Sequence, residues 1–289
     1  MPPQPSHVRT MGRFANIVFM CIPCSIFAKK FDLKATYATS DDYYISLINQ
    51  LGLHLFTGSK SYRETIEING SNFMSLFNKH EFKFRFIKNA KCFFQDNNDI
   101  FNLVQEHFIE KQDDIIKANP YKERYNNNND IHVHIRLGDM SKRPLPIGYF
   151  INTINNINNY DNLYISSDSS SKAPLIKNLL SKFPNAILRG FDSSPIPTLQ
   201  FASTCKYNIL SSGSYSALIG YLSFFSKVYY IDFDTIPAYE MWFGHTIYYC
   251  RHDWIKCLHQ EKTMVTDTGS ADTSEVPDEV TDANNNDNL

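Results

Sequence analysis

The C-terminal half of the sequence predicts an α/β fold built on a parallel sheet. Strand-length apolar segments alternate there with helix-length amphipathic segments, which is the pattern of a Rossmann-like unit. The expected strands cover 131–136, 162–166, 185–188, 207–211 and 227–232, and the expected helices cover 149–158, 172–182, 196–204 and 214–225. With 289 residues, 43% of them hydrophobic, the chain has material for one large domain or two small ones.

The first of these strands, within Ile131–Asp139, carries the strongest chemical signal. Its apolar residues alternate with His132, His134 and Arg136, and a Leu-Gly-Asp turn follows. An arginine at the carboxyl end of such a strand reaches the crevice where open α/β sheets bind ligands, and its planar fork suits phosphate. We interpret Arg136 as the main phosphate ligand. The alternative is an arginine that pairs with Asp139 and closes the turn.

A second anion site is expected near the N-terminus. Gly12 and Arg13 directly precede an apolar segment of helix length that extends to about Lys30. A Gly-Arg turn at a helix start brings backbone N–H groups and a cation together. The alternative for Arg13 is a solvated loop charge.

The apolar segment itself predicts a buried first helix. It resembles a signal-peptide core, but it lacks a small-residue cleavage site and continues into Lys29 and Lys30. No run of 18 apolar residues exists, so we expect no transmembrane helix and a cytoplasmic protein. Cys21 and Cys24 form a C-x-x-C without a second pair for zinc, and we expect buried thiols.

Two further segments place polar side chains at strand ends. Asp168 follows the expected strand 162–166, where a carboxylate can accept from a ribose hydroxyl or a base, or cap a helix. Small hydroxyl residues at a helix start can donate to phosphate or ribose, or act as caps. Four such residues, Ser211, Ser212, Ser214 and Ser216, stand where the expected strand 207–211 leads into the expected helix 214–225, with the aromatic hydroxyl of Tyr215 among them.

Charge and composition divide the chain. The net charge of −2 gives no electrostatic case for nucleic acid. Residues 262–289 carry seven acids and one lysine, which leaves the rest of the chain at about +4, and we expect this tail to be disordered. Residues 35–90 are the least informative. The asparagine run at 126–129 predicts a linker or exposed loop, so we expect an N-terminal domain over 1–125 and a C-terminal Rossmann-like domain over 130–260.

Taken together, these segments resemble the alpha-1,2-fucosyltransferase family of the fucosyltransferase superfamily. The residues 131–139 match its H-x-R-x-G-D motif, and the segment from Gly12 to Phe19 matches four positions of G-R-L-G-N-Q-M-F, including Asn16. The segment ending at Asp168 is similar to its middle motif, and 207–222 is similar to its third. Trp242-Phe243 stands where the family has W-F. The resemblance covers about 12–243 in order.

The resemblance implies a GT-B fold, in which two Rossmann-like domains face each other across a cleft. The N-terminal domain would lie on the acceptor side, and the C-terminal domain would hold the nucleotide-sugar donor. It further implies an inverting transfer of fucose from GDP-fucose to a glycan hydroxyl, by an alpha-1,2 linkage to galactose, without a metal or other cofactor. Arg136 and His134 would be catalytic. The donor would be bound by Gly12, Arg13, Asn16, Asp139, Asp168, Ser212, Ser214, Tyr215 and Ser216. His132 and His134 share a strand face, but two histidines beside a cation are a poor metal site.

Three departures from the family pattern keep alternatives open. Leu137 replaces a second arginine, Thr198 stands where several relatives have an acid, and Ala217-Leu218 replaces two tryptophans. One alternative is a transferase of the same fold that uses another nucleotide sugar. The other is an inactive relative that binds glycan or nucleotide. The acceptor, the general base and the oligomeric state are not readable from the sequence.

Overall fold

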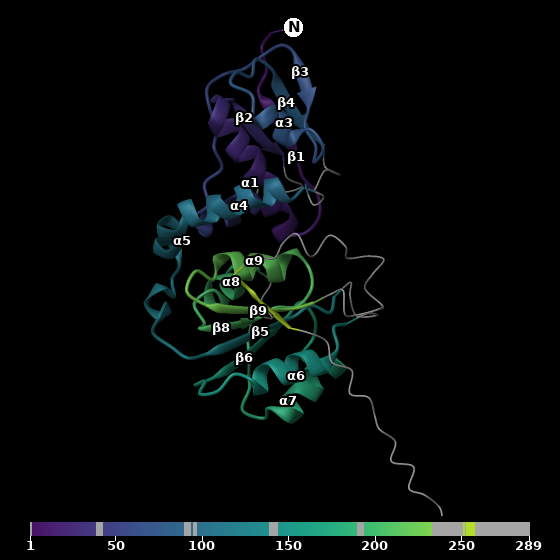
Figure 1. The fold of residues 1–289 in the computed structure, drawn as a ribbon, viewed down its shortest axis with the longest axis vertical. Helices are drawn as coiled ribbons and strands as arrows, with labels where there is room; N and C mark the ends of the chain where they lie inside the picture. Colours follow the sequence, from purple (N-terminus) through teal and green to yellow (C-terminus); the bar gives the residue numbers. More distant parts are fainter. Residues whose placement is uncertain are drawn as a thin grey trace, which may run out of the picture.

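The computed structural model describes residues 2–38, 43–89, 94, 97–138, 144–189, 194–232, 251 and 253–257. Asp139, Trp242-Phe243 and the acidic tail lie outside these residues. Two parallel sheets stand one above the other, with α4 and α5 between them (Figure 1). The elements of the first half are β1 Ser6–Arg9, α1 Phe14–Phe31, β2 Ala35–Ala38, α2 Tyr43–Gln50, β3 Thr65–Glu67, α3 Phe73–Phe77, β4 Arg85–Lys88, α4 Asn98–Glu110, α5 Gln112–Ala118 and the 3-10 helix η1 Lys122–Arg124.

The second half forms a sheet whose strand order brings two chemically important segments together. Its elements are β5 Ile131–Ile135, α6 Ile147–Asn155, β6 Leu163–Ser167, α7 Pro174–Lys182, β7 Ile187–Leu188, α8 Ile196–Ala202, β8 Tyr207–Ile209, α9 Ser214–Leu222, β9 Lys227–Ile231 and β10 Ile255–Cys257. The six strands are parallel in the order β7-β6-β5-β8-β9-β10. The chain order reverses between β5 and β8, and such a switch point is where open sheets bind ligands. The predicted strands and helices of this half are confirmed, with boundaries that differ by a few residues.

The first half has the same kind of reversal. Its four strands are parallel in the order β2-β1-β4-β3, so the switch point lies between β1 and β4. The loop that follows β1 contains Gly12 and Arg13 and leads into α1. Most of this sheet comes from the segment 35–90, whose short strands gave no clear period in the sequence.

Helix α1 is the buried first helix that the sequence predicts. It is long and apolar enough to cross a membrane by length and composition, but 78% of that stretch is buried inside the fold. Both Cys21 and Cys24 are buried in it and form no disulfide, and burial raises the pKa of Cys21 to about 12. These cysteines therefore contribute to packing.

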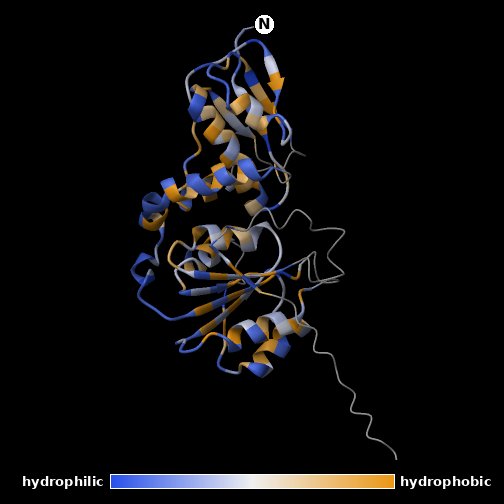
Figure 2. Cartoon of the chain, in the orientation of Figure 1, coloured by the Kyte–Doolittle hydropathy of each residue, from blue (hydrophilic) through white to orange (hydrophobic). Residues whose placement is uncertain are grey.

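One apolar core connects the two halves. It contains α1 and most of the first half, together with residues of α8 and α9 and Trp254 from the second. Tyr221 of α9 packs against Phe19 and Phe108, with ring centroids 5.6 and 5.2 Å apart. A separate cluster lies between the second sheet and α6 and α7. Figure 2 shows hydrophobic residues in the strands of that sheet and in the helices on both sides of it, as expected for parallel strands covered on both sides.

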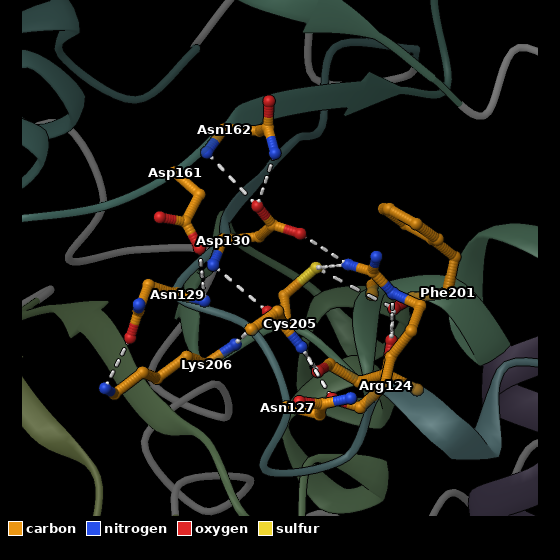
Figure 3. Close-up of polar contacts among 12 residues, drawn as sticks. Arg124, Asn127, Asn129, Asp130, Asp161, Asn162, Phe201, Cys205 and Lys206 are labelled. Atoms are coloured by element: carbon orange, nitrogen blue, oxygen red, sulfur yellow. Dashed lines mark hydrogen bonds and ion pairs between the residues drawn. The ribbon is translucent and has the colours of Figure 1, made fainter.

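The asparagine run is attached to the second sheet rather than projecting as a loop (Figure 3). Arg124 pairs with the buried carboxylate of Asp130 at 2.6 Å, and Asp130 also accepts two hydrogen bonds from Asn162. The Asn128 side chain donates to the carbonyl oxygens of Arg124 and Thr204. Asn126 and Asn127 are exposed, as predicted, but the connection is held in place because its polar groups close the amino ends of β5, β6 and β8.

Candidate active site

A cleft of about 540 Å³ lies where the two switch points meet. It contains eight of the predicted site residues and several others. Its lining comprises Gly12, Arg13, Phe14, Ala15, Asn16, Tyr43, Tyr44, His134, Arg136, Ser166, Ser167, Asp168, Ser194, Pro195, Thr198, Ser214 and Tyr215. Both halves of the chain contribute to it. Its volume is within the range of small-molecule and nucleotide sites.

Arg136 lies directly after β5, against the backbone where α9 begins. Its backbone N–H donates to Ser211 Oγ at 3.1 Å. Gly213 has φ +90°, and a Cβ there would lie 2.5 Å from Arg136 Nη1. Position 213 therefore requires glycine, because it must adopt a left-handed conformation and also leave room for the guanidinium.

Two helix N-termini open into the cleft. Helix α1 starts after Arg13 and helix α9 after Gly213, and no side-chain hydrogen bond caps either start within the described residues. Neither first turn contains an acidic residue. The backbone N–H groups of a helix's first turn and the positive end of its dipole favour an anion nearby. Arg13 and Arg136 add two guanidinium groups from opposite sides.

His134 lies behind the first turn of α9. Its Nδ1 is 2.6 Å from Ser216 Oγ, and its ring lies 5.0 Å from that of Tyr215. Burial, aided by the Arg136 charge and opposed by Asp168, lowers the pKa of His134 to about 4. The imidazole is therefore neutral at neutral pH and connects β5 to α9.

His132 is a satisfied core histidine. Its two ring nitrogens lie 3.2 Å from Asn208 Oδ1 and 2.8 Å from Ser166 Oγ, and burial lowers its pKa to about 3. All five residues of β5 are buried, so the histidine face of this strand is covered as well as the apolar one. In the part of the chain that the structure describes, no group of three His, Cys, Asp or Glu side chains is placed to hold a metal ion.

Asp168 connects the two halves at the cleft. Its Oδ1 accepts from the backbone N–H groups of Leu137 and Gly138 at 2.7 and 3.0 Å, and its Oδ2 pairs with Arg13 Nη1 at 3.0 Å. Burial of Asp168 opposes its ionisation, but the hydrogen bonds from the Leu137 and Gly138 backbone and the positive charge of Arg136 lower its pKa. The carboxylate thus has three protein partners already, which the sequence did not indicate.

Several predicted residues lie elsewhere than expected. Ser212 and Ser216 are buried and do not line the cleft, and Ser216 contacts His134 instead. Leu137 is 5% exposed and packs into the apolar cluster between the second sheet and helices α6 and α7. The side chain at position 137 therefore points into the core, and an arginine there would not reach the cleft without a change in this packing. Thr198 lines the cleft next to Tyr215.

Three aromatic residues of the cleft were not predicted. Phe14 stacks on Tyr44 with centroids 6.2 Å apart, and Tyr44 contacts Tyr43, which is 47% exposed. They form an aromatic wall on the N-terminal side. The adjacent tyrosines at the start of a helix were the available signal, but nothing in the sequence placed α2 at the cleft.

No family model matches the chain, and no curated protein matches it in sequence. Solved structures do match. The E. coli heptosyltransferase WaaC with ADP has a TM-score of 0.53 at 8% identity, over 89% of this chain and 94% of that one. The fucosyltransferase NodZ from Bradyrhizobium has a TM-score of 0.50 at 11% identity, over 80% and 96%.

The fold is GT-B. Both neighbours are GT-B glycosyltransferases, and the likeness extends over nearly their whole length. The predicted fold class is therefore confirmed. At these identities the likeness shows the fold alone, and the chemistry has to be argued from the cleft.

Proposed function

We propose that the protein is an inverting, metal-independent glycosyltransferase that moves fucose from GDP-fucose to a hydroxyl of an acceptor glycan, by an alpha-1,2 linkage to galactose. The observation that carries the proposal is the convergence of Arg13, Arg136 and two uncapped helix N-termini on one inter-domain cleft. A diphosphate fits this set of donors. The motif resemblance supports fucose, and one fold neighbour is named as a fucosyltransferase.

The chemistry follows from where charge develops. The acceptor oxygen attacks the anomeric carbon while the bond from that carbon to the diphosphate oxygen breaks, and the electron pair leaves with GDP. Attack from the opposite face inverts the anomeric centre, and the hydroxyl proton passes to a base. Fixed positive groups around the departing diphosphate lower this barrier. Arg136 and the start of α9 supply them from one domain, and Arg13 supplies one from the other.

His134 fits a positioning role better than proton transfer. A base with a pKa of about 4 accepts protons weakly at neutral pH. Its hydrogen bond to Ser216 and its contact with Tyr215 hold the first turn of α9 against β5. We therefore assign His134 to the alignment of the helix start that faces the diphosphate.

The main alternative is a transferase that uses another nucleotide sugar. A heptosyltransferase with bound ADP shares the fold to a similar extent as the fucosyltransferase does. The cleft groups described above recognise a diphosphate, which adenosine and guanosine donors have in common.

Calorimetric titration tests the proposal. GDP, ADP and GDP-fucose are titrated into wild type, Arg136→Ala and the control Arg63→Ala, which removes an exposed arginine outside the cleft, with and without EDTA. We expect GDP binding that survives EDTA and weakens about 10- to 100-fold in Arg136→Ala, as for loss of charged hydrogen bonds worth about 1.5–3 kcal/mol. GDP release from GDP-fucose with lactose as acceptor tests turnover.

Each other outcome is decisive. Wild type that binds ADP and no guanine nucleotide would favour the alternative donor. Binding of GDP-fucose without transfer to any galactoside would point to an inactive binding protein. Equal affinity in wild type and Arg136→Ala would remove the phosphate assignment.

A further inference from the structure

Asp168 is the point where the two halves of the cleft are joined. One of its oxygens accepts from Leu137 N and Gly138 N, directly after the strand that carries Arg136. The other oxygen accepts from Arg13 Nη1, across the cleft on the loop before α1. A single carboxylate therefore contacts the segments that carry both cleft arginines.

Gly138 is required for this arrangement. A Cβ at that position would lie 2.6 Å from Asp168 Oδ2 and 3.4 Å from Arg13 Nη1. Any side chain there would displace the ion pair. This close approach is a physical reason for the glycine after Arg136 and Leu137.

Arg13 keeps free hydrogen-bonding capacity while it is held. A guanidinium has five N–H donors, and the contact with Asp168 occupies one nitrogen. The side chain is 62% exposed, whereas that of Asp168 is 26% exposed. Held by Nη1, the guanidinium can present its remaining N–H groups to a ligand in the cleft without a large loss of rotamer freedom on binding.

We propose that Asp168 is a positioning residue for the nucleotide diphosphate, which fixes Arg13 and the backbone at 137–138 in the conformation that binds it. This inference rests on the proposed function. It predicts an unexpected direction for the change in anion affinity when the carboxylate of Asp168 is removed. Removing a carboxylate from an anion site normally strengthens anion binding, because a like charge is lost. If Asp168 acts by holding Arg13, its loss weakens anion binding instead.

A double-mutant cycle measures whether the effect of Asp168 on GDP affinity depends on Arg13. Asp168→Asn keeps an oxygen for the two backbone N–H groups but loses the charge that holds Arg13. We expect GDP affinity to fall about 5- to 10-fold in Asp168→Asn and about 10-fold in Arg13→Ala. In the Arg13→Ala background, Asp168→Asn should leave affinity unchanged or raise it. Glu110→Gln is the control, because it breaks an exposed ion pair with Lys29 at the far end of α1.

Tighter GDP binding in Asp168→Asn with Arg13 present would overturn the proposal. Gly138→Ala is a second variant with the same expected loss, because it displaces the pair without changing charge. Thermal unfolding of each variant identifies any that fail to fold.

A ligand-free measurement separates this inference from the proposed function. Hydrogen exchange at the amides of Leu137 and Gly138 should be slow in wild type and in Asp168→Asn, and at least 10-fold faster in Asp168→Ala. The Arg13 side-chain N–H signals in NMR should broaden in Asp168→Asn. If the variants show these effects but wild type binds no nucleotide, the proposed function fails and the structural role of Asp168 stands. Unchanged exchange in Asp168→Ala would overturn the inference itself.

Discussion

At the scale of single residues, burial decides what the histidines of β5 can do. His132 and His134 alternate with apolar residues, and a partly exposed strand would leave them ionisable. The structure buries this face, and each ring lies within hydrogen-bonding distance of a serine, Ser166 of β6 for His132 and Ser216 of α9 for His134. Their pKa values fall to about 3 and about 4, and that of His107 falls to about 4, because burial disfavours the charged form.

These low pKa values predict acid sensitivity in a defined window. Below pH 6.5 the unfolded chain protonates these histidines while the folded chain does not, so the free energy of unfolding falls between pH 6.5 and about 4. Urea unfolding at pH 7.5 to 4.5 measures this loss. In His134→Gln the unfolded chain takes up about one proton fewer, so the slope of the free energy of unfolding against pH should fall by about 1.4 kcal/mol per pH unit. The exposed His54→Gln is the control, and an unchanged slope in His134→Gln would contradict the assignment.

At the scale of elements, the start of α9 depends on one glycine. Gly213→Ala places a Cβ at φ +90° and against Arg136. We expect the free energy of unfolding to fall by about 1–3 kcal/mol, and GDP binding to weaken because the guanidinium is displaced. Gly148→Ala is a matched control in helix α6, since a Cβ there meets nothing within 4 Å. That change should stabilise the helix by up to about 1 kcal/mol. Equal effects of the two substitutions would exclude the steric argument.

At the scale of the whole molecule, the shared core predicts that both halves unfold together. The apolar cluster extends from α1 through α9, and Tyr221 is 1% exposed at its centre. Scanning calorimetry should give one transition whose calorimetric and van't Hoff enthalpies agree. Tyr221→Ala should cost about 3–5 kcal/mol and separate the transitions of the two halves. Ile109→Ala, at a residue 51% exposed on α4, should change stability little. Two transitions in wild type would show that the core is not one cooperative unit.

The C-terminal sheet was predictable because its signals are local. Strand and helix periods from 131 to 232 appear in consecutive residues, and the order of β and α elements implies parallel pairing. Arg136, Arg13, Gly12 and the Gly213–Ser216 turn could be selected because arginines and small residues at strand ends and helix starts have a chemistry that does not depend on distant contacts.

The tertiary structure decided what the sequence could not. Asp168 pairs with Arg13 across 155 residues of chain, and Tyr44 stacks beside Phe14 in a wall of the same cleft. Nothing local marks such contacts, because they depend on how two sheets are placed relative to each other. Burial of Ser216 and Leu137 likewise follows from which helices cover β5. The sequence by itself determined the α/β class and the anion-binding residue types; packing of α1 against α9 determined which of those residues share one cleft.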